Sequence, residues 1–391
     1  MPNRYPVPTM LGAVASRTGD EMAGMAILLL AFGTSSHLAQ GALAFGALQL
    51  AAALGGPPLG VWLDRARSGW PLALGVAAYS VGLGGTALAL GSGMTGIAVT
   101  VAFLAGLFGP AVTGGWSSRL SHADPWIARR LTVFDASSYS VTGLIAPGLA
   151  GLGYAAVGPV APLVLSIGFL LLGAAVAPAA HHRANPGLPA APPQRFLAVI
   201  GTGFGAVAGS RLLLAATSSS FLTYAGVGFF TVALPLIGAA QFRSAGHGSL
   251  LLVVMAAMAL IANGVLSRLD ALGSPVLVLT IATLVSAVGL LAMGLPWAVL
   301  VVAGAVLFGA GDGPQLAALI QVRRDQSPAS VRAQVLTTGA SVKITAAGLG
   351  TLAAGFVVDQ GIWVLLLIAA SLHFVGGAVA AAGLRASRGQ M

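Results

Sequence analysis

Long apolar stretches separated by short polar turns dominate this chain. Only 7% of its 391 residues are charged, whereas soluble domains carry about a quarter charged residues. A helix of about 20 apolar residues can cross the hydrocarbon core of a bilayer, which is about 30 Å thick. The stretches lack the two-residue alternation of a membrane β-barrel, so we expect an all-α polytopic membrane protein. Twelve such stretches occur, at residues 10–33, 41–62, 71–91, 95–118, 130–154, 158–180, 211–239, 247–267, 274–294, 297–321, 331–357 and 361–384.

The net charge of +9 is spread along the chain rather than gathered into one patch. Arginines fall in alternate loops and at the C-terminus, and the opposite set of loops carries only Arg243. Cytoplasmic loops collect Lys and Arg, so we expect both termini and the long middle loop in the cytoplasm. This placement argues for a lipid bilayer, and against nucleic acid, as the partner of the basic residues.

Signatures of catalysis and of cofactor binding are missing from the sequence. There is no cysteine, which excludes disulfides and thiol chemistry. No phosphate-binding loop of the type G-x-x-x-x-G-K-[ST] and no H-E-x-x-H pair occurs. We therefore expect no enzyme activity, no cofactor and no metal. The single lysine among many Ala, Gly and Arg is typical of a GC-rich bacterial genome, and we expect the bacterial cytoplasmic membrane as the location.

A polar, proline-rich segment at residues 181–195 divides the chain. We expect an N-terminal six-helix bundle at 1–180 and a C-terminal six-helix bundle at 211–391. Residues 181–210 would form a cytoplasmic linker. Within it, residues 196–210 are apolar but rich in glycine, which favours an interfacial helix over a thirteenth span.

The two halves share landmarks at a nearly constant distance. Pro110 corresponds to Pro314, and Arg119 corresponds to Arg323, each pair 204 residues apart. Pro125 and Pro328 follow at 203 residues. These matches indicate a duplicated six-helix unit. Parallel repeats of this kind place a substrate path between the halves near the middle of the bilayer.

The loop between the second and third stretches reads Gly60-Val-Trp-Leu-Asp64-Arg65-Ala-Arg67. It resembles the signature loop G-x-x-x-D-R-x-x-R-R of the major facilitator superfamily, with the final basic pair reduced to Arg67. The layout resembles that family over nearly the whole chain. The second-half counterpart lacks the acidic residue at the matching position, and stretch 95–118 has no arginine of the kind found in drug exporters of the family.

The resemblance implies a gate at the signature loop and export as the direction. In the family this loop holds the cytoplasmic side shut against the start of the eleventh span. We expect gating by Asp64, Arg65 and Arg67; a solvated turn is the alternative. The motif Ala146-Pro147-Gly-Leu-Ala150-Gly151 resembles the antiporter sequence G-P-x-x-G-G. The further gating residues are Asp135, which could join the gate through Arg129 or Arg130, and Arg332, which could pair with Asp64. The helix-packing residues are Gly60, Pro147 and Gly151.

Three ionisable residues lie close together in the first stretch. Asp20 is about ten residues into it, or roughly 15 Å along a helix axis. Arg17 precedes Asp20 by three residues and Glu21 by four, so it could reach either one along a helix face. We expect one of the two carboxylates to carry a proton or to contact the substrate. The alternative is a fixed ion pair that allows the span to insert into the bilayer.

Two more ionisable residues lie in the second half. Asp312 stands between Gly311 and Gly313-Pro314, where Gly and Pro free backbone carbonyls. Lys343, the sole lysine, lies about twelve residues into its stretch. Asp312 could contact the substrate or only neutralise Lys343, and Lys343 could be a coupling group or a structural counter-ion.

Together these features predict a secondary transporter that moves a small apolar or amphiphilic solute by alternating access. Protons would drive export, and the protein would work as a monomer. An importer of a small organic anion, held by Arg17, Arg211 or Lys343, is the nearest alternative. A membrane scaffold without transport activity is a third, although a scaffold has little reason to keep buried carboxylates.

Overall fold

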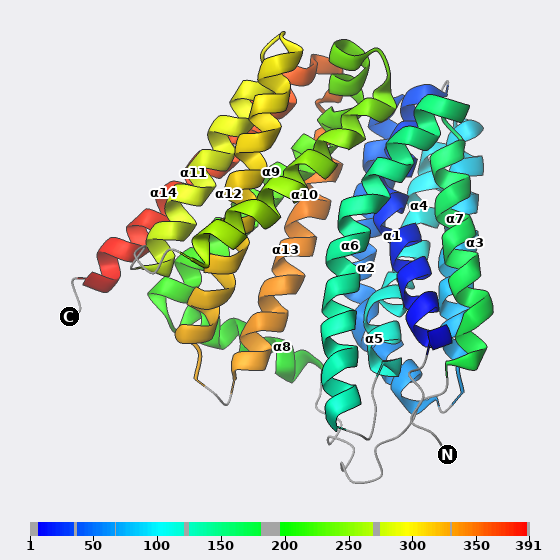
Figure 1. Ribbon diagram of the computed structural model, residues 1–391, viewed down its shortest axis with the longest axis horizontal. Helices are drawn as coiled ribbons and strands as arrows, with labels where there is room; N and C mark the ends of the chain where they lie inside the picture. The colour runs from blue at the N-terminus through cyan, green and yellow to red at the C-terminus, as the bar shows by residue number, and fades with distance from the viewer. Residues whose placement is uncertain are drawn as a thin grey trace. The chain divides into compact units, whose positions relative to one another are not determined.

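Helices make up almost all of the structure, a computed structural model that describes residues 7–34, 37–66, 68–120, 125–180, 196–268, 274–328 and 331–388 (Figure 1). No strand occurs within these ranges. In hydrocarbon an unpaired backbone amide costs several kcal/mol, and a helix pairs these groups within one segment. The predicted all-α fold of a polytopic membrane protein is confirmed.

The backbone contacts divide the chain into two compact units. The first comprises Met1–Ala190 with Ser244–Ser249, and the second comprises Ala191–Arg243 with Leu250–Met391. The second unit thus begins earlier than the expected bundle at 211, and it includes the short helix α8 (Phe196–Ala208). Residues 181–195 of the expected linker lie outside the described residues.

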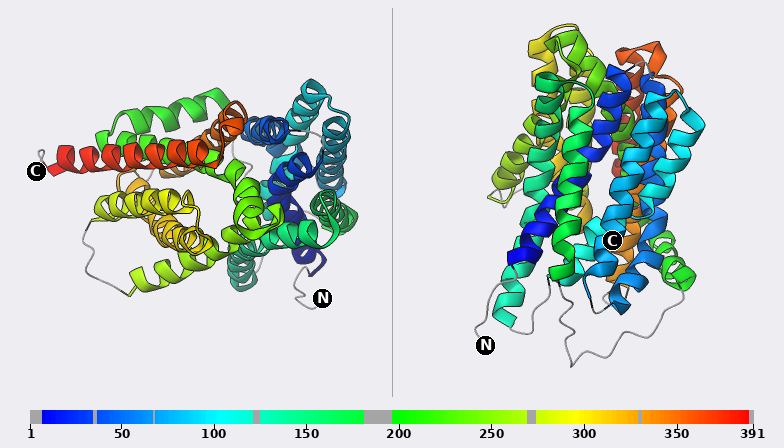
Figure 2. Two further views of the ribbon diagram at one scale, coloured as in Figure 1. Left: turned by 90° about the horizontal axis from the view of Figure 1, so that it is seen from above. Right: turned by 90° about the vertical axis from the view of Figure 1, so that its right-hand side faces the viewer.

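Helix α1 lies at the centre of the first unit. It packs against α7 and α6, and it also contacts α2 and α3 (Figure 2). Such a position requires small residues where helices cross. At Gly12 a side chain would collide with the ring of Trp116, which is fully buried and donates from Nε1 to Ser16 Oγ at 2.9 Å. The α-helices of this unit are α1 Val7–Gly33, α2 Leu38–Arg65, α3 Trp70–Gly91, α4 Thr95–Gly106, α5 Trp116–Arg119, α6 Pro125–Val157 and α7 Ala161–Val176.

The fourth predicted span contains a change of helix type. The stretch predicted at 95–118 corresponds to one segment long and apolar enough to span a membrane, Thr95–Arg119. Within that segment α4 ends at Gly106, and a π-helical turn, Ala111–Gly115, precedes α5. Pro110 stands at the junction, and because proline has no backbone N–H it cannot donate to the carbonyl four residues earlier. The π-helical turn begins at the next residue, Ala111. Single turns of this kind occur mostly within longer helices.

Helix α9 has the central place in the second unit. It packs against α14 and α13, and it also contacts α12 and α8 (Figures 1 and 2). Pro314 lies inside α12, and this α-helix continues past it, unlike the fourth span at Pro110 in the first unit. The remaining helices are α9 Arg211–Phe242, α10 Ala245–Leu266, α11 Pro275–Met293, α12 Ala298–Asp325, α13 Arg332–Gly355 and α14 Ile362–Arg388.

Ten segments of the described chain are long and apolar enough to cross a membrane. The other two long helices are α1, with 27 residues, and α13, with 24. Helix α1 is less apolar because Arg17, Asp20 and Glu21 lie within it. The count of twelve spans stays a prediction.

In each unit a glycine lets two helices approach closely. A side chain at Gly106 of α4 would meet the backbone of Leu48 in α2. In the second unit, a side chain at Gly309 of α12 would meet the backbone of Met255 in α10. Close approach of backbones at small residues is the usual means of helix packing in membranes. The duplication inferred from sequence therefore has a counterpart in how these helix pairs cross.

Candidate functional site

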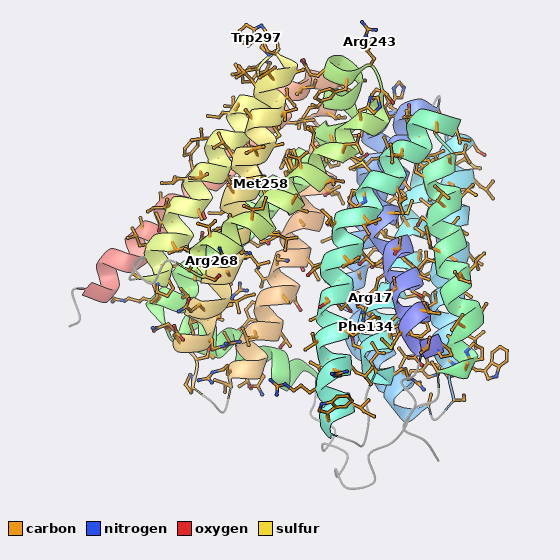
Figure 3. All side chains as sticks on the ribbon, viewed as in Figure 1. Arg17, Phe134, Arg243, Met258, Arg268 and Trp297 are labelled. Atoms are coloured by element: carbon orange, nitrogen blue, oxygen red, sulfur yellow. The ribbon has the colours of Figure 1, made fainter. Side chains whose placement is uncertain are left out.

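A buried ion pair joins α1 and α6 in the first unit. The Arg17 side chain is 1% exposed, and its Nη2 lies 2.6 Å from Oδ1 of Asp135, which is 22% exposed. Arg17 Nη2 also donates to Ser117 Oγ of α5 at 3.0 Å, and Nη1 donates to Ser138 Oγ. The guanidinium carbon lies 3.8 Å from the centre of the Tyr139 ring. One cation is thus held by a carboxylate, two hydroxyls and an aromatic face. Figure 3 labels the position of Arg17.

The sequence of α6 explains this arrangement. Asp135, Ser138 and Tyr139 are spaced by three and four residues, which places them on one face of a helix. Ser117 connects to the same carboxylate, because its hydroxyl donates to Asp135 Oδ2 at 2.9 Å. The sequence identified Arg17 and Asp135 individually, whereas the roles of Ser117 and Ser138 emerge only from the structure.

These contacts correct two expected partnerships. Arg17 was expected to pair along α1 with Asp20 or Glu21, but it pairs across to α6. Asp135 was expected to join Arg129 or Arg130 in a gate, and its partner is instead Arg17. The physical reason is the crossing of α1 and α6, which brings oppositely charged side chains within hydrogen-bond distance.

Asp20 and Glu21 differ in their surroundings. Asp20 is half-buried and accepts a hydrogen bond from the Tyr79 hydroxyl of α3 at 2.8 Å. Glu21 is exposed. Consecutive residues of an α-helix point about 100° apart, so the two carboxylates cannot both point directly at α3. Tyr79 was not singled out from the sequence, where a lone tyrosine in an apolar stretch gives no signal.

A second polar cluster lies on α9, α12 and α13 in the second unit. Lys343 Nζ is 4.7 Å from the centre of the Tyr224 ring. The half-buried Asp312 interacts electrostatically with both Lys343 and Tyr224. Whether Asp312 contacts the substrate or only neutralises Lys343 stays a prediction, and Tyr224 is a further polar residue of this cluster.

Three unpartnered hydroxyls lie on α9, in the two helical turns that precede Tyr224. Ser219 and Ser220 of α9 are fully buried, and Thr217 is 8% exposed. The hydroxyl oxygens of all three have no hydrogen-bond partner among the described residues. Ser and Thr side chains inside helices often donate to the carbonyl four residues earlier, and these three do not. Ser220 and Tyr224 are four residues apart, so the unsatisfied hydroxyl lies on the same helix face as the Tyr224 ring.

The predicted gate lies partly outside the described residues. Asp64 and Arg65 form the end of α2, but the described residues do not include their side chains or any part of Arg67. Arg129 is exposed, and Arg130 lies over the ring of Trp126 at 3.9 Å. Arg332 is exposed and donates to the backbone oxygen of Ser327 at 3.4 Å.

Arg119 holds the end of α2 instead. This arginine is 3% exposed and donates to the backbone oxygens of Leu63 at 3.2 Å and Ser68 at 3.0 Å. It also reaches the oxygen of Ala180 at 3.4 Å. Positive charge at the carbonyl end of a helix is stabilising. Arg119 was noted in the sequence only as a landmark of the repeat.

The three predicted packing residues behave differently. A side chain at Gly151 would meet the backbone of Gly246, which belongs to the same unit. Pro147 is buried inside α6. A side chain at Gly60 would meet no described atom within 4 Å, so the close packing expected there is not found.

No group of three His, Asp or Glu side chains that could hold a metal occurs in the described part of the chain. His373 is 1% exposed, its Nδ1 lies 2.8 Å from the oxygen of Ala369, and its ring meets that of Phe308 edge-on. Arg211 is exposed. These two residues belong to neither cluster.

Neither a protein-family model nor a curated protein matches the sequence. Solved structures match the fold. An autoinhibited peptide transporter of the POT family is 17% identical, with a TM-score of 0.71 over 98% of this chain and 97% of that chain. The POT family transporter PepTSo is 11% identical, with a TM-score of 0.73 over 100% of both chains. The nucleoside transporter NupG is 14% identical, with a TM-score of 0.72 over 97% of this chain and 99% of that chain.

The fold is the major facilitator superfamily fold. This likeness is one of architecture, since the identities lie between 11% and 17%. It confirms the fold that the resemblance of the signature loop implied.

Proposed function

We propose that this protein is a secondary active transporter that moves a small organic solute by alternating access. The observation that carries the proposal is the pair of polar clusters inside span-length helices, Arg17 with Asp135 and Lys343 with Asp312 and Tyr224. Ionisable groups within a membrane span cost about 2.5–3.5 kcal/mol each on insertion scales and usually mark an ion or substrate path. A fold shared with peptide and nucleoside transporters supports the same conclusion.

Proton coupling is part of the proposal. Asp20 and Asp312 are half-buried carboxylates within helices. Each of them interacts with a polar side chain on another helix. The Tyr79 hydroxyl donates to Asp20, while Asp312 interacts electrostatically with Lys343 and Tyr224. A carboxylate in such a place can exchange a proton when solute alters its surroundings.

For the solute we propose an apolar or amphiphilic organic molecule, and for the direction we propose export. The unpartnered hydroxyls of α9 would supply a few hydrogen bonds within otherwise apolar helices. The small-residue motif around Pro147, which packs tightly at Gly151, supports export through its likeness to the antiporter sequence.

Import of a small organic anion is the second candidate. Arg17 is a weak anion anchor because its charge is already matched by Asp135. The observation that favours import is Lys343, whose ammonium group lies over an aromatic ring near unpartnered hydroxyls.

The test uses the purified protein in liposomes that contain a pH-sensitive dye. A thermal-shift screen at two pH values first selects a solute, because a ligand that binds the folded protein raises its melting temperature. Flux of that solute is then measured with the acidic side inside or outside. Export coupled to protons predicts solute movement toward the acidic side together with proton movement away from it.

The decisive variants are Asp20→Asn and Asp312→Asn. We expect at least one to abolish accumulation driven by the pH gradient while solute exchange without a gradient continues. Asp325→Asn is the matched control, since Asp325 is exposed at the end of α12 and outside both clusters. If both variants transport as the unaltered protein does, the coupling assignment is wrong. Solute and protons moving in the same direction would establish import.

A further inference from the structure

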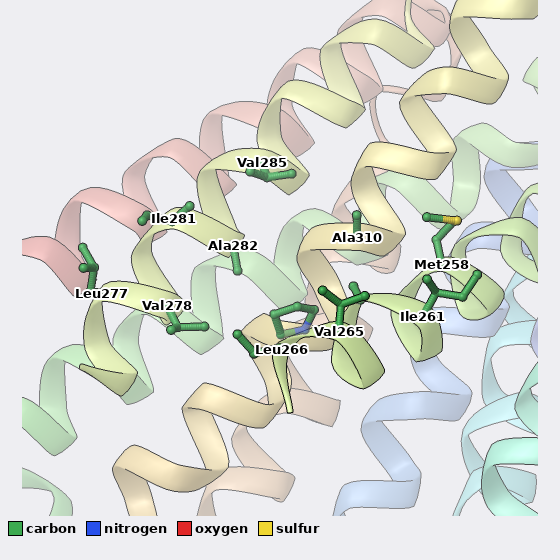
Figure 4. A pocket seen from close by; sticks show the side chains of 12 residues that line it. Met258, Ile261, Val265, Leu266, Leu277, Val278, Ile281, Ala282, Val285 and Ala310 are labelled. Carbon is green, nitrogen blue, oxygen red and sulfur yellow. The ribbon is translucent and has the colours of Figure 1, made fainter. Parts of the chain in front are cut away.

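An apolar groove of about 410 Å³ lies on the second unit between α10, α11 and α12 (Figure 4). All the residues that line it are Ala, Val, Leu, Ile, Met or Pro. The volume falls within the range of small-ligand sites, roughly 300–1,000 Å³. Water in such a groove would find no hydrogen-bond partners among the lining side chains, so a hydrocarbon is the favoured occupant.

The groove opens to the outside of this helix group. Ile261, Val265 and Ile281 line it and are 56%, 53% and 49% exposed. In a span these side chains meet lipid tails rather than water. Ala282 and Pro314 form the buried floor. A flexible chain that comes from the bilayer can therefore lie in the groove without a change in the helices.

One end of the groove carries a positive charge. Leu266 lines the groove as the last residue of α10, and Arg268 follows two positions later, exposed, with its backbone N–H bonded to Val265 O at 3.0 Å. Met258, which lines the other end, is ten residues before Arg268, or roughly 15 Å along the helix. Figure 3 shows Arg268 near the end of α10 and Met258 nearer its middle.

We propose that this groove binds one acyl chain of an anionic phospholipid whose phosphate contacts Arg268. The apolar lining matches the chain, and the arginine at the mouth matches the headgroup in sign and in place. The positive net charge of +9 also favours anionic lipid over zwitterionic lipid around the protein. The site does not include either polar cluster, so its occupant is distinct from the proposed solute.

The test measures lipid retention by native mass spectrometry. Purified protein is taken from nanodiscs that contain equal amounts of phosphatidylglycerol and phosphatidylcholine with identical acyl chains. We expect the unaltered protein to retain phosphatidylglycerol preferentially. Arg268→Gln should reduce that preference roughly fivefold, which corresponds to about 1 kcal/mol for one basic residue at an anionic membrane surface.

A second variant fills the groove. Ala262 lines it and is half-buried, so Ala262→Phe should reduce the retention of both lipids. The matched controls are Arg243→Gln, at an exposed arginine at the end of α9, and Ala317→Phe, on an exposed face of α12 that does not line the groove. Both controls should retain lipid as the unaltered protein does. Thermal unfolding of every variant in phosphatidylcholine micelles identifies any that fail to fold.

Three outcomes would overturn the proposal. The first is equal retention of the two lipids by the unaltered protein. The second is unchanged retention in both Arg268→Gln and Ala262→Phe. The third is a dimer that Ala262→Phe dissociates while lipid retention persists, which would make the groove a contact between two copies. Failure of the solute-flux experiment would leave lipid retention unaffected, so the two proposals can fail separately.

Discussion

Arg17 is almost completely removed from solvent, and its environment explains how a charge can stay there. Both terminal nitrogens of its guanidinium donate to oxygens, and the Tyr139 ring covers one face. A buried cation without such partners would be strongly destabilising. The burial of Arg17 therefore depends on its ion pair with Asp135.

We expect Asp135→Asn to destabilise the protein by about 3–5 kcal/mol, because it leaves Arg17 buried without a counter-ion. The measurement is thermal or denaturant unfolding in detergent. Arg17→Met combined with Asp135→Leu should recover much of this stability, since an apolar pair of similar size removes the buried charge. If the pair also acts in transport, the double variant stays inactive although it is stable. An Asp135→Asn protein as stable as the unaltered one would contradict the prediction.

At the scale of residues, the sequence shows which side chains matter more readily than which ones meet. Arg17, Asp20, Asp135 and Asp312 stand out because ionisable groups are rare in apolar stretches. The partner of Arg17 depends on the docking of α1 against α6, which the spacing within one helix does not reveal. Spacing alone favoured a pair along α1, and tertiary packing produced a different one.

Among the elements, α2 contains two glycines with opposite surroundings. A side chain at Gly55 would meet the backbone of Leu107, whereas one at Gly60 would meet no described atom within 4 Å. Glycine is thus required at position 55 because the backbone of Leu107 lies against it. At the second position it only weakens the helix.

We expect Gly55→Ala to lower stability by about 1–3 kcal/mol, the usual effect of overpacking. Gly60→Ala on the same helix is the matched control and should have a neutral or stabilising effect, up to about 1 kcal/mol, because alanine favours a helix over glycine. Melting temperatures in detergent compare the two. Equal losses at both positions would show that helix packing at Gly55 is not the cause.

Element boundaries were predictable where composition changes and not where backbone geometry changes. The stretch predicted at 331–357 corresponds to α13, Arg332–Gly355, and that at 211–239 corresponds to the start of α9 at Arg211. The change of helix type after Gly106 was not predicted, because residues 95 to 118 contain no charged residue and are mostly apolar. Pro110 marks the site of the change, but Pro314 in the other half shows that proline alone does not enforce one.

At the scale of the whole molecule, the distribution of arginines predicts the orientation in the membrane, and this orientation can be measured directly. The chain contains no cysteine, so a single introduced thiol gives an unambiguous signal. Arg268 follows α10 and Arg243 follows α9, at loops that the charge pattern assigns to opposite sides. Both residues are exposed.

We expect Arg243→Cys in intact cells to react with a maleimide that cannot cross the membrane. Arg268→Cys should react only after the membrane is opened. The physical reason is the excess of basic residues in loops that stay in the cytoplasm. Labelling of both cysteines in opened membranes controls for accessibility. The reverse pattern in intact cells would invert the predicted topology.

Arg119 and Arg323 occupy equivalent positions in the two halves and are both buried, but their contacts differ. Nine residues separate Pro110 from Arg119 and Pro314 from Arg323, yet the first interval contains a π-helical turn and the second continues as an α-helix. Arg119 consequently fastens the end of α2, whereas the Arg323 guanidinium lies against Gly339 of α13. A hybrid assembled from two copies of the second half would lack the fastening at α2, and one assembled from two copies of the first would lack Lys343 and Asp312. Each half therefore makes a contact or carries a charged pair that the other half lacks.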